Sequence, residues 1–282
     1  MKLATYRDGS RDGQLVVVSA DLTLAHHASG IATRLQQVLD DWNFLAPQLQ
    51  DLARTLALGK ARHAFPFEPR MCMAPLPRAC RLVDADLAPG VARIGSEMAG
   101  DAMTGPHGAL PQAEPGTALD FAARLVLALG DVPRGAAQDQ ARDGVRLLML
   151  ACHWQHVLCG PPRAWLDASM AWAPVALTPD ELGRDWRRGR LALALSTSVD
   201  GTAQPPAEAS PASVPEAGAL VAGLARHRAV TAGTLLALPG PQRTALDGAA
   251  QIEIDARDGL GQSVFGAILQ RHRSDDDRAV AG

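Results

Sequence analysis

The sequence predicts an α+β protein in which β-strands predominate, and three observations support this class. The first 24 residues hold β-branched runs, such as Leu15–Ser19, beside Asp-Gly turn signals. Residues 31–58 carry apolar side chains at spacings of three and four, which is typical of an amphipathic helix. The later apolar runs are short and are mostly bounded by Gly- or Pro-containing turns; we expect strands at 125–132, 191–199 and 231–238 and a hairpin at 251–269.

The helical segment and the prolines after it suggest how the chain is divided. Pro47 predicts a break, or the start of a second helix near it. We expect the apolar stripe to pack on the small N-terminal sheet, with a coiled coil or a partner-binding face as the alternatives. Phe65–Pro77 is rich in proline and is interpreted as an extended linker. The predicted units are a small N-terminal α/β domain at 1–72, a C-terminal domain at 73–272 and a disordered tail at 273–282.

Three further segments complete the prediction. Residues 201–215 are rich in Pro, Ala and Ser and are expected to form a flexible loop. Leu220–Arg228 is expected to be a short amphipathic helix. The apolar run Val145–Ala151 fits a helix or a buried strand equally well by its pattern alone.

Composition excludes several classes of function. The formal net charge of −3 and the pI near 6.2 give no reason to expect binding to nucleic acid or to an anionic membrane. The first residues contain no apolar signal-peptide core, and no run reaches membrane-spanning length. We therefore expect a cytoplasmic protein with reduced cysteines. Only Lys2 and Lys60 of the 27 basic residues are lysines, a bias that indicates a GC-rich bacterial source.

The stretch 118–135, ALDFAARLVLALGDVPRG, resembles a strand and turn of the fumarylacetoacetate hydrolase family, D-F-E-G-E-V followed by D-V-P-x-G. The phrases at 74–79 (APLPRA), 173–182 (APVALTPDEL) and 261–268 (GQSVFGAI) also resemble that family. The resemblance implies a fumarylacetoacetase-like fold, with a mixed, largely β rolled sheet in the C-terminal domain. It also makes Val145–Ala151 a strand.

The resemblance further implies a hydrolase of diketo acids such as acylpyruvates. In the family, Mg²⁺ or Mn²⁺ chelates and polarises the 2-oxo acid group of the substrate. Such hard cations prefer anionic oxygen ligands, and the family supplies an E-x-E pair from one strand together with Asp residues from other segments. Family members are usually dimers, so a homodimer, or a heterodimer with an active relative, is the expected assembly.

This chain departs from the family at the positions that should carry the chemistry. Ala122 and Arg124 stand where the E-x-E carboxylates should be. His153 replaces an Asp ligand, and Asp167 replaces a Lys that contacts the substrate. These replacements predict that no catalytic residue, Mg²⁺ site or Mn²⁺ site is retained, and no cofactor is expected.

Other candidate residues have a functional and a structural interpretation. Zinc ligation is a hypothesis for the C-H-x-x-H-x-x-C pattern of Cys152, His153, His156 and Cys159; the alternative is a former active-site loop filled with assorted side chains. His107 is a weak catalytic candidate, because no partner is evident. Trp154, Trp165 and Trp172 are expected to plug the former cavity or to line an apolar pocket.

The favoured hypothesis is a non-catalytic family member that acts as an interaction or regulatory subunit. The alternatives are a retuned hydrolase or decarboxylase and a binding protein, each for a small oxo acid.

Overall fold

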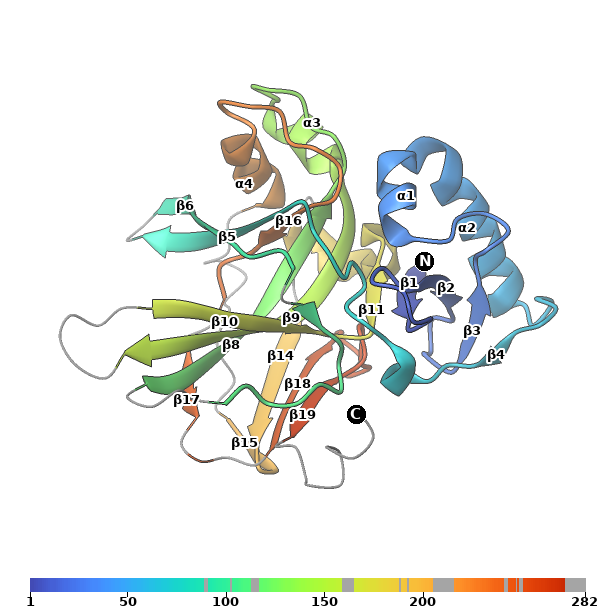
Figure 1. Ribbon diagram of the computed structural model, residues 1–282. Helices are drawn as coiled ribbons and strands as arrows, with labels where there is room; N and C mark the ends of the chain where they lie inside the picture. Colours follow the sequence, from blue (N-terminus) through green and yellow to red (C-terminus); the bar gives the residue numbers. More distant parts are fainter. Residues whose placement is uncertain are drawn as a thin grey trace.

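The computed structural model describes residues 1–88, 91–101, 103–112, 117–158, 165–187, 189–191, 193–204, 216–240, 243–246, 248 and 251–271. These residues form the expected α+β fold, in which strands predominate (Figure 1). The predicted loop at 201–215 lies mostly outside the described residues, and the predicted tail at 273–282 lies wholly outside them.

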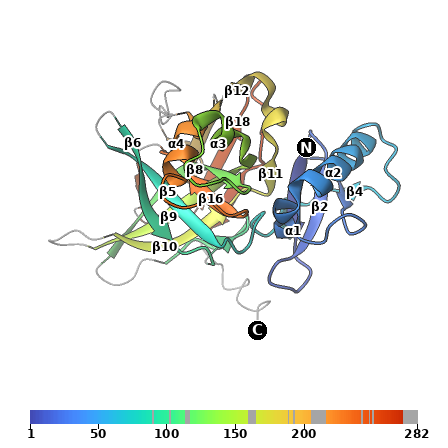
Figure 2. The same cartoon turned by 90° about the horizontal axis from the view of Figure 1, so that it is seen from above.

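The N-terminal part is a small antiparallel sheet covered by two helices. Its strands are β1 (Lys2–Tyr6), β2 (Gln14–Val18), β3 (Leu24–His27) and β4 (Phe65–Pro66). The helices are α1 (Leu35–Asp40) and α2 (Trp42–Ala57), whose buried apolar residues join Leu3, Leu15 and Val17 of the sheet in one core. The helical stripe therefore packs on the N-terminal sheet. Figure 2 shows this part at one end of the molecule.

The helix break falls earlier than the sequence predicted. It lies at Asp41, whose φ of −126° and ψ of 50° separate α1 from α2, whereas Pro47 lies inside α2. Pro47 is the sixth residue of α2, where it cannot donate to the carbonyl of Asn43 and its ring crowds that carbonyl, yet the helix continues through it.

A long sheet forms the body of the molecule. Its order is β4-β3-β2-β1-β11-β9-β8-β16-β5-β6, and β10, β7 and β17 pair with strands along it. The N-terminal sheet is continuous with it, because Leu3 on β1 pairs with Ala176 on β11. The strands beyond β1 are β5 (Arg81–Ala88), β6 (Val91–Met98), β7 (Met103–Thr104), β8 (Thr117–Leu129), β9 (Val145–Leu158), β10 (Trp165–Trp172), β11 (Val175–Leu177), β16 (Thr234–Ala237) and β17 (Thr244–Leu246).

The two faces of this sheet belong to two cores. Successive residues of a strand point to opposite faces. On β8, Phe121, Leu127 and Leu129 join one core, whereas Val126 and Ala128 join the other. A second sheet, β15-β14-β18-β19, covers the first core, whereas the second core extends to α1 and α2. The strands of the second sheet are β14 (Ala194–Val199), β15 (Thr202–Ala203), β18 (Gln251–Arg257) and β19 (Ile268–Arg271).

The remaining elements are short. They are α3 (Gln138–Asp143), α4 (Ala217–Leu224), the hairpin of β12 (Trp186–Arg187) and β13 (Arg190–Leu191), and two 3₁₀ segments, η1 (Pro69–Met71) and η2 (Pro179–Asp185). The expected helix at Leu220–Arg228 thus begins and ends several residues earlier. Among the described residues, no helix is long and apolar enough to cross a membrane.

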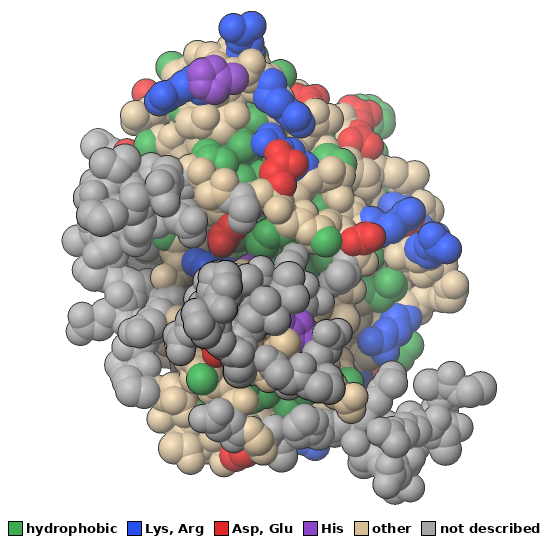
Figure 3. All heavy atoms as spheres, turned by 60° about the vertical axis from the view of Figure 1, so that its left-hand side comes forward, with side chains coloured by type: hydrophobic (Ala, Val, Ile, Leu, Met, Phe, Trp, Pro, Cys, Tyr) green, Lys and Arg blue, Asp and Glu red, His purple; other side chains and the backbone are tan. Residues whose placement is uncertain are grey.

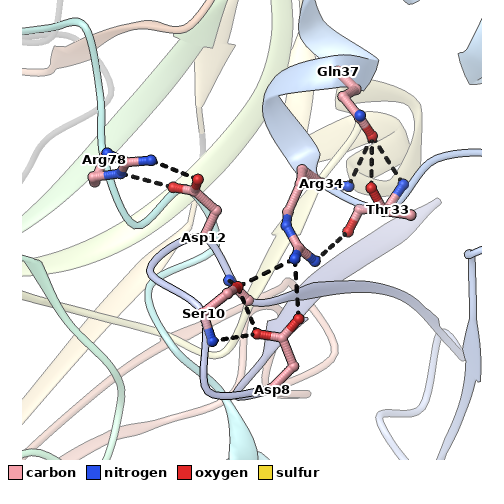
Figure 4. A network of polar contacts seen from close by, with 8 residues as sticks. Asp8, Ser10, Asp12, Thr33, Arg34, Gln37 and Arg78 are labelled. Carbon is pink, nitrogen blue, oxygen red and sulfur yellow. Dashed lines mark hydrogen bonds and ion pairs between the residues drawn. The ribbon is translucent and has the colours of Figure 1, made fainter.

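A polar network fixes the β1–β2 turn against its surroundings (Figure 4). Arg34, just before α1, forms an ion pair with Asp8 at 3.1 Å. In the same turn Asp12 accepts a hydrogen bond from Nε of Arg78 at 2.8 Å. This contact lowers the pKa of the Asp12 carboxyl below its usual value. Arg78 follows the proline-rich segment and precedes β5. The network therefore joins the N-terminal part to the segment that leads into β5.

Candidate functional site

The family positions singled out in the sequence lie on neighbouring strands of the long sheet. Ala122 on β8 pairs with His153 on β9, and His153 pairs in turn with Met170 on β10. Cross-strand pairs share a face, so these three residues form one row. Ala122 and His153 are 2% and 1% exposed. We name the face that carries this row the site face.

The rows on either side complete the site face. Towards the sheet interior, Arg124 pairs with Ala151, which pairs with Trp172. Towards the strand ends, Asp120 pairs with Gln155, which pairs with Asp167. Ala122, Arg124, His153 and Asp167 therefore occupy three adjacent rows. Asp167 is assigned to its row by backbone pairing alone.

Arg124 is held in an ion pair that sequence reasoning missed. Its Nη2 lies 3.5 Å from Oδ2 of Asp84, on β5, and both side chains are almost fully buried. Its Nη1 donates to the carbonyl oxygen of Leu238 at 3.4 Å. Gly240 makes room for this side chain, since a Cβ at position 240 would lie 2.8 Å from Cδ of Arg124. The guanidinium is thus a packed part of the protein interior.

A second arginine, Arg243, reaches the site face from the segment before β17. Because Thr244 pairs with Phe121, Arg243 continues the row of Ala122. Its Nη2 donates to the backbone carbonyl oxygens of Asp120 at 3.2 Å and His153 at 3.0 Å.

The electrostatic environment of Arg243 is unfavourable to its charge. Burial and, next, the positive charge of Arg124 lower the pKa of Arg243 to about 10, although Asp120 and Asp84 act in the opposite direction. Arg124 and Arg243 occupy adjacent rows of the site face, so the charge of one disfavours the charge of the other. Figure 3 looks onto the side where β8 and β10 begin and β9 ends, and shows basic, acidic and histidine side chains at the surface between atoms that are not described.

The residues present do not fit the divalent metal ion that the family resemblance implies. Ala122 has no donor atom, and Arg124 brings a positive charge to a position that should carry a carboxylate. The described residues contain no group of three His, Cys, Asp or Glu side chains placed to hold a metal ion.

The proposed zinc ligands do not converge. Cys152, His153 and His156 all lie on β9, which continues as a strand through Leu158, and Cys159 lies outside the described residues. Strand alternation puts His153 on the opposite face from Cys152 and His156. Cys152 and His156 are four residues apart along an extended strand, or roughly 13 Å. Ligands of one zinc ion lie about 2.0–2.3 Å from it, so these three side chains cannot share one.

The cysteines are expected to differ sharply in reactivity. Burial raises the pKa of Cys72 to about 12 and raises that of Cys152 as well, whereas Cys80 is exposed. Because the thiolate is the nucleophile, iodoacetamide at pH 8 should alkylate Cys80 in the native protein and leave Cys72 and Cys152 unmodified until urea is added. Peptide mass mapping reads this directly. Rapid native labelling of Cys152 would contradict the buried placement of β9.

His107 lies in a half-buried segment after β7. Burial and the charges of Arg70, Arg271 and Arg7 lower its pKa, so the imidazole is neutral at pH 7. The charged groups that shift it are all arginines, and a carboxylate that would orient a general base is not among them.

The tryptophans do not form the single cluster that the sequence suggested. Trp154 belongs to the core beneath the second sheet, whereas Trp172 belongs to the core of the site face. The reason is again the alternation of side chains along paired strands. The side chain of Trp165 lies outside the described residues.

Asp84 and Arg243 are the site residues that sequence reasoning missed. Asp84 stands between apolar residues in Leu82–Ala85, and a lone carboxylate in an apolar strand is a signal of a buried partner. For Arg243 no such signal exists, because its contacts depend on the pairing of β17 with β8 across more than a hundred residues.

Comparisons with known proteins agree with this architecture. Residues 1–78 match the family described as fumarylacetoacetase N-terminal domain 2. Among proteins of curated function, no sequence matches the chain.

Solved structures share the fold over nearly the whole chain. Maleylpyruvate hydrolase from Sphingobium sp. SYK-6, in complex with manganese(II) and pyruvate, is 18% identical, with a TM-score of 0.70 over 96% of this chain and 98% of that one. 5-Carboxymethyl-2-hydroxymuconate delta-isomerase from Mycobacterium smegmatis is 12% identical, with a TM-score of 0.62 over 98% of this chain and 100% of that one. 2-Hydroxyhepta-2,4-diene-1,7-dioate isomerase from Mycobacterium marinum is 14% identical, with a TM-score of 0.59 over 96% of this chain and 98% of that one.

The protein therefore has the fold shared by these hydrolases and isomerases. Its first 78 residues match the fumarylacetoacetase N-terminal domain 2 family, which agrees with the resemblance seen in the sequence.

Proposed function

We propose that this protein has lost the metal-dependent hydrolysis of diketo acids and acts as a non-catalytic interaction or regulatory subunit. The observation that carries the proposal is the replacement of a carboxylate pair by Ala122 and Arg124. Arg124 is engaged with Asp84 at 3.5 Å and packed against Gly240, so its positive charge is fixed inside the site.

Physical chemistry supports the loss of the metal. Mg²⁺ requires about six oxygen ligands at close to 2.1 Å, and neither Ala122 nor Arg124 supplies one. A buried guanidinium beside a divalent ion adds repulsion on the order of several kcal/mol. Loss of the metal ion would remove the Lewis acid that polarises the 2-oxo group in the family mechanism.

Turnover of maleylpyruvate and acylpyruvates, with Mn²⁺ or Mg²⁺ added, tests the loss of activity. We expect no hydrolysis above the uncatalysed rate, whereas the Sphingobium maleylpyruvate hydrolase, as a positive control, should turn over its substrate in the same buffer. Metal-dependent turnover that persists in the Ala122→Leu variant would place the chemistry elsewhere. Metal-dependent turnover by the unmodified chain would overturn the proposal.

The assembly we propose is a homodimer, or a heterodimer with an active relative of the same fold. Light scattering after size-exclusion chromatography detects a homodimer. Co-purification with a tagged active relative detects a heterodimer. A monomer in both experiments would count against the interaction role while leaving the loss of metal chemistry in place.

A second candidate is the binding of a small oxo acid without turnover. It is favoured by the two guanidinium groups on the site face, and by the pyruvate bound to the Sphingobium enzyme of the same fold. A retuned hydrolase that uses zinc has no support among the described residues, because their Cys and His side chains do not converge.

A further inference from the structure

The outward side of α2 carries a second row of side chains, away from the apolar stripe that packs on the N-terminal sheet. Phe44 in α2 and Leu58, the residue after its last turn, are 66% and 68% exposed. Residues seven apart lie on one side of a helix to within about 20°, so both share that side with Asp51. A single exposed apolar residue is ordinary, but two large ones in one row leave an apolar surface open to water.

Two opposite charges occupy the middle of this row. Nη1 of Arg54 lies 3.0 Å from Oδ1 of Asp51, and the two side chains are 75% and 74% exposed. An ion pair so open to water contributes little to the stability of the helix. We name the row the outer stripe; it consists of Phe44, Pro47, Asp51, Arg54 and Leu58, apolar at both ends and charged between them.

The outer stripe is complementary to a second copy of itself that runs in the opposite direction. With a two-fold axis between Asp51 and Arg54, each carboxylate lies at the level of the other copy's guanidinium. Leu58 then lies at the level of Pro47 of the other copy, one turn from its Phe44. A parallel copy would instead place like charges at the same level, where they repel. An interface with two-fold symmetry makes each such contact twice.

We propose that the outer stripe of α2 is the docking surface for a second copy of this chain, which binds through its own outer stripe in antiparallel orientation. The inference rests on the proposed function, because it names the surface of the homodimer proposed there. The apolar ends supply affinity, and the crossed charges fix direction and register. Figure 2 shows α2 at the end of the molecule remote from β6 and β10, so the far edge of the long sheet lies away from this interface.

Light scattering after size-exclusion chromatography, over a range of protein concentrations, tests the surface. We expect the mass of two chains for the unmodified protein. Phe44→Glu and Leu58→Glu should each weaken the dimer at least about tenfold, because each removes two apolar contacts and places two charges in the interface. Leu260→Glu makes the same change at a residue that is 85% exposed, between β18 and β19, and should leave the dimer intact. Unchanged far-UV circular dichroism shows that each variant is folded.

Exchange of the charges tests the antiparallel arrangement. Asp51→Arg leaves two positive charges on the outer stripe, and Arg54→Asp leaves two negative ones. Each variant alone should be monomeric at a concentration at which the unmodified protein is dimeric, because like charges face one another. An equimolar mixture of the two variants should form dimers again, and so should the double variant Asp51→Arg/Arg54→Asp.

Each contrary outcome overturns a defined statement. A dimer that survives both Phe44→Glu and Leu58→Glu would overturn this inference and leave the proposed homodimer on another surface. Mixed charge variants that stay monomeric would overturn the antiparallel pairing. A monomeric chain that captures a tagged active relative, and loses it after Phe44→Glu, would overturn the choice of a second copy. A monomer that captures no relative would contradict the proposed interaction role as well.

Discussion

Replacing Arg124 by methionine is expected to lower the free energy of unfolding by about 3 kcal/mol. The substitution keeps most of the side-chain volume but removes the charge that faces Asp84, and both side chains are almost fully buried. A buried carboxylate that loses this positive neighbour loses much of the compensation for its desolvation cost. Urea unfolding followed by far-UV circular dichroism measures the change.

The double variant Asp84→Asn/Arg124→Met separates charge from packing. It removes both charges and should recover about 2 kcal/mol of the loss, which appears as coupling energy in the double-mutant cycle. Arg228→Met serves as the exposed control and should change stability by less than about 0.5 kcal/mol. If the Arg124→Met variant is as stable as the unmodified protein, the guanidinium is not the buried partner of Asp84.

Replacing Trp154 by alanine is expected to cost about 3–5 kcal/mol of unfolding free energy. Its ring is fully buried, lies 5.1 Å from that of Phe121, and donates from Nε1 to Oε1 of Gln270 at 2.8 Å. Because Gln270 is on β19, this contact joins the long sheet to the second sheet. The variant loses both the ring volume and the bridge between sheets.

Trp154→Phe divides the effect into its parts. It keeps most of the apolar ring but leaves Gln270 without its donor, so we expect a loss of about 1–2 kcal/mol. The same urea titration reads both variants. Equal stability of the Trp154→Ala variant and the unmodified protein would mean that the two sheets are not packed through this ring.

The positions of several strands, but not their order in the sheet, could be predicted from the sequence. Short β-branched runs and glycine-containing turns predicted Leu15–Ser19 and the closing hairpin to within a few residues of β2, β18 and β19. The resemblance resolved Val145–Ala151 as a strand, which pattern alone left open. These features depend on local chemistry, which the sequence displays directly.

The candidate site could be predicted only in part. Ala122, Arg124, His153 and Asp167 were singled out one by one from the sequence, and their position on neighbouring strands comes from the strand pairing. What now fills the site depends on non-local pairing: Asp84 arrives through β5, and Arg243 through β17. The separation of Trp154 from Trp172 likewise follows from which face each strand position occupies, which a one-residue shift would reverse.

Metal content is the most direct test of the central claim that the family's metal site is gone. The protein is dialysed against trace Mg²⁺, Mn²⁺ and Zn²⁺, and the bound metal is measured by inductively coupled plasma mass spectrometry. We expect far less than one metal ion per chain for all three metals, and the same result for the Ala122→Leu variant. One Mn²⁺ or Mg²⁺ per chain, lost in the Ala122→Leu variant, would contradict the account and call for a search for diketo-acid hydrolysis.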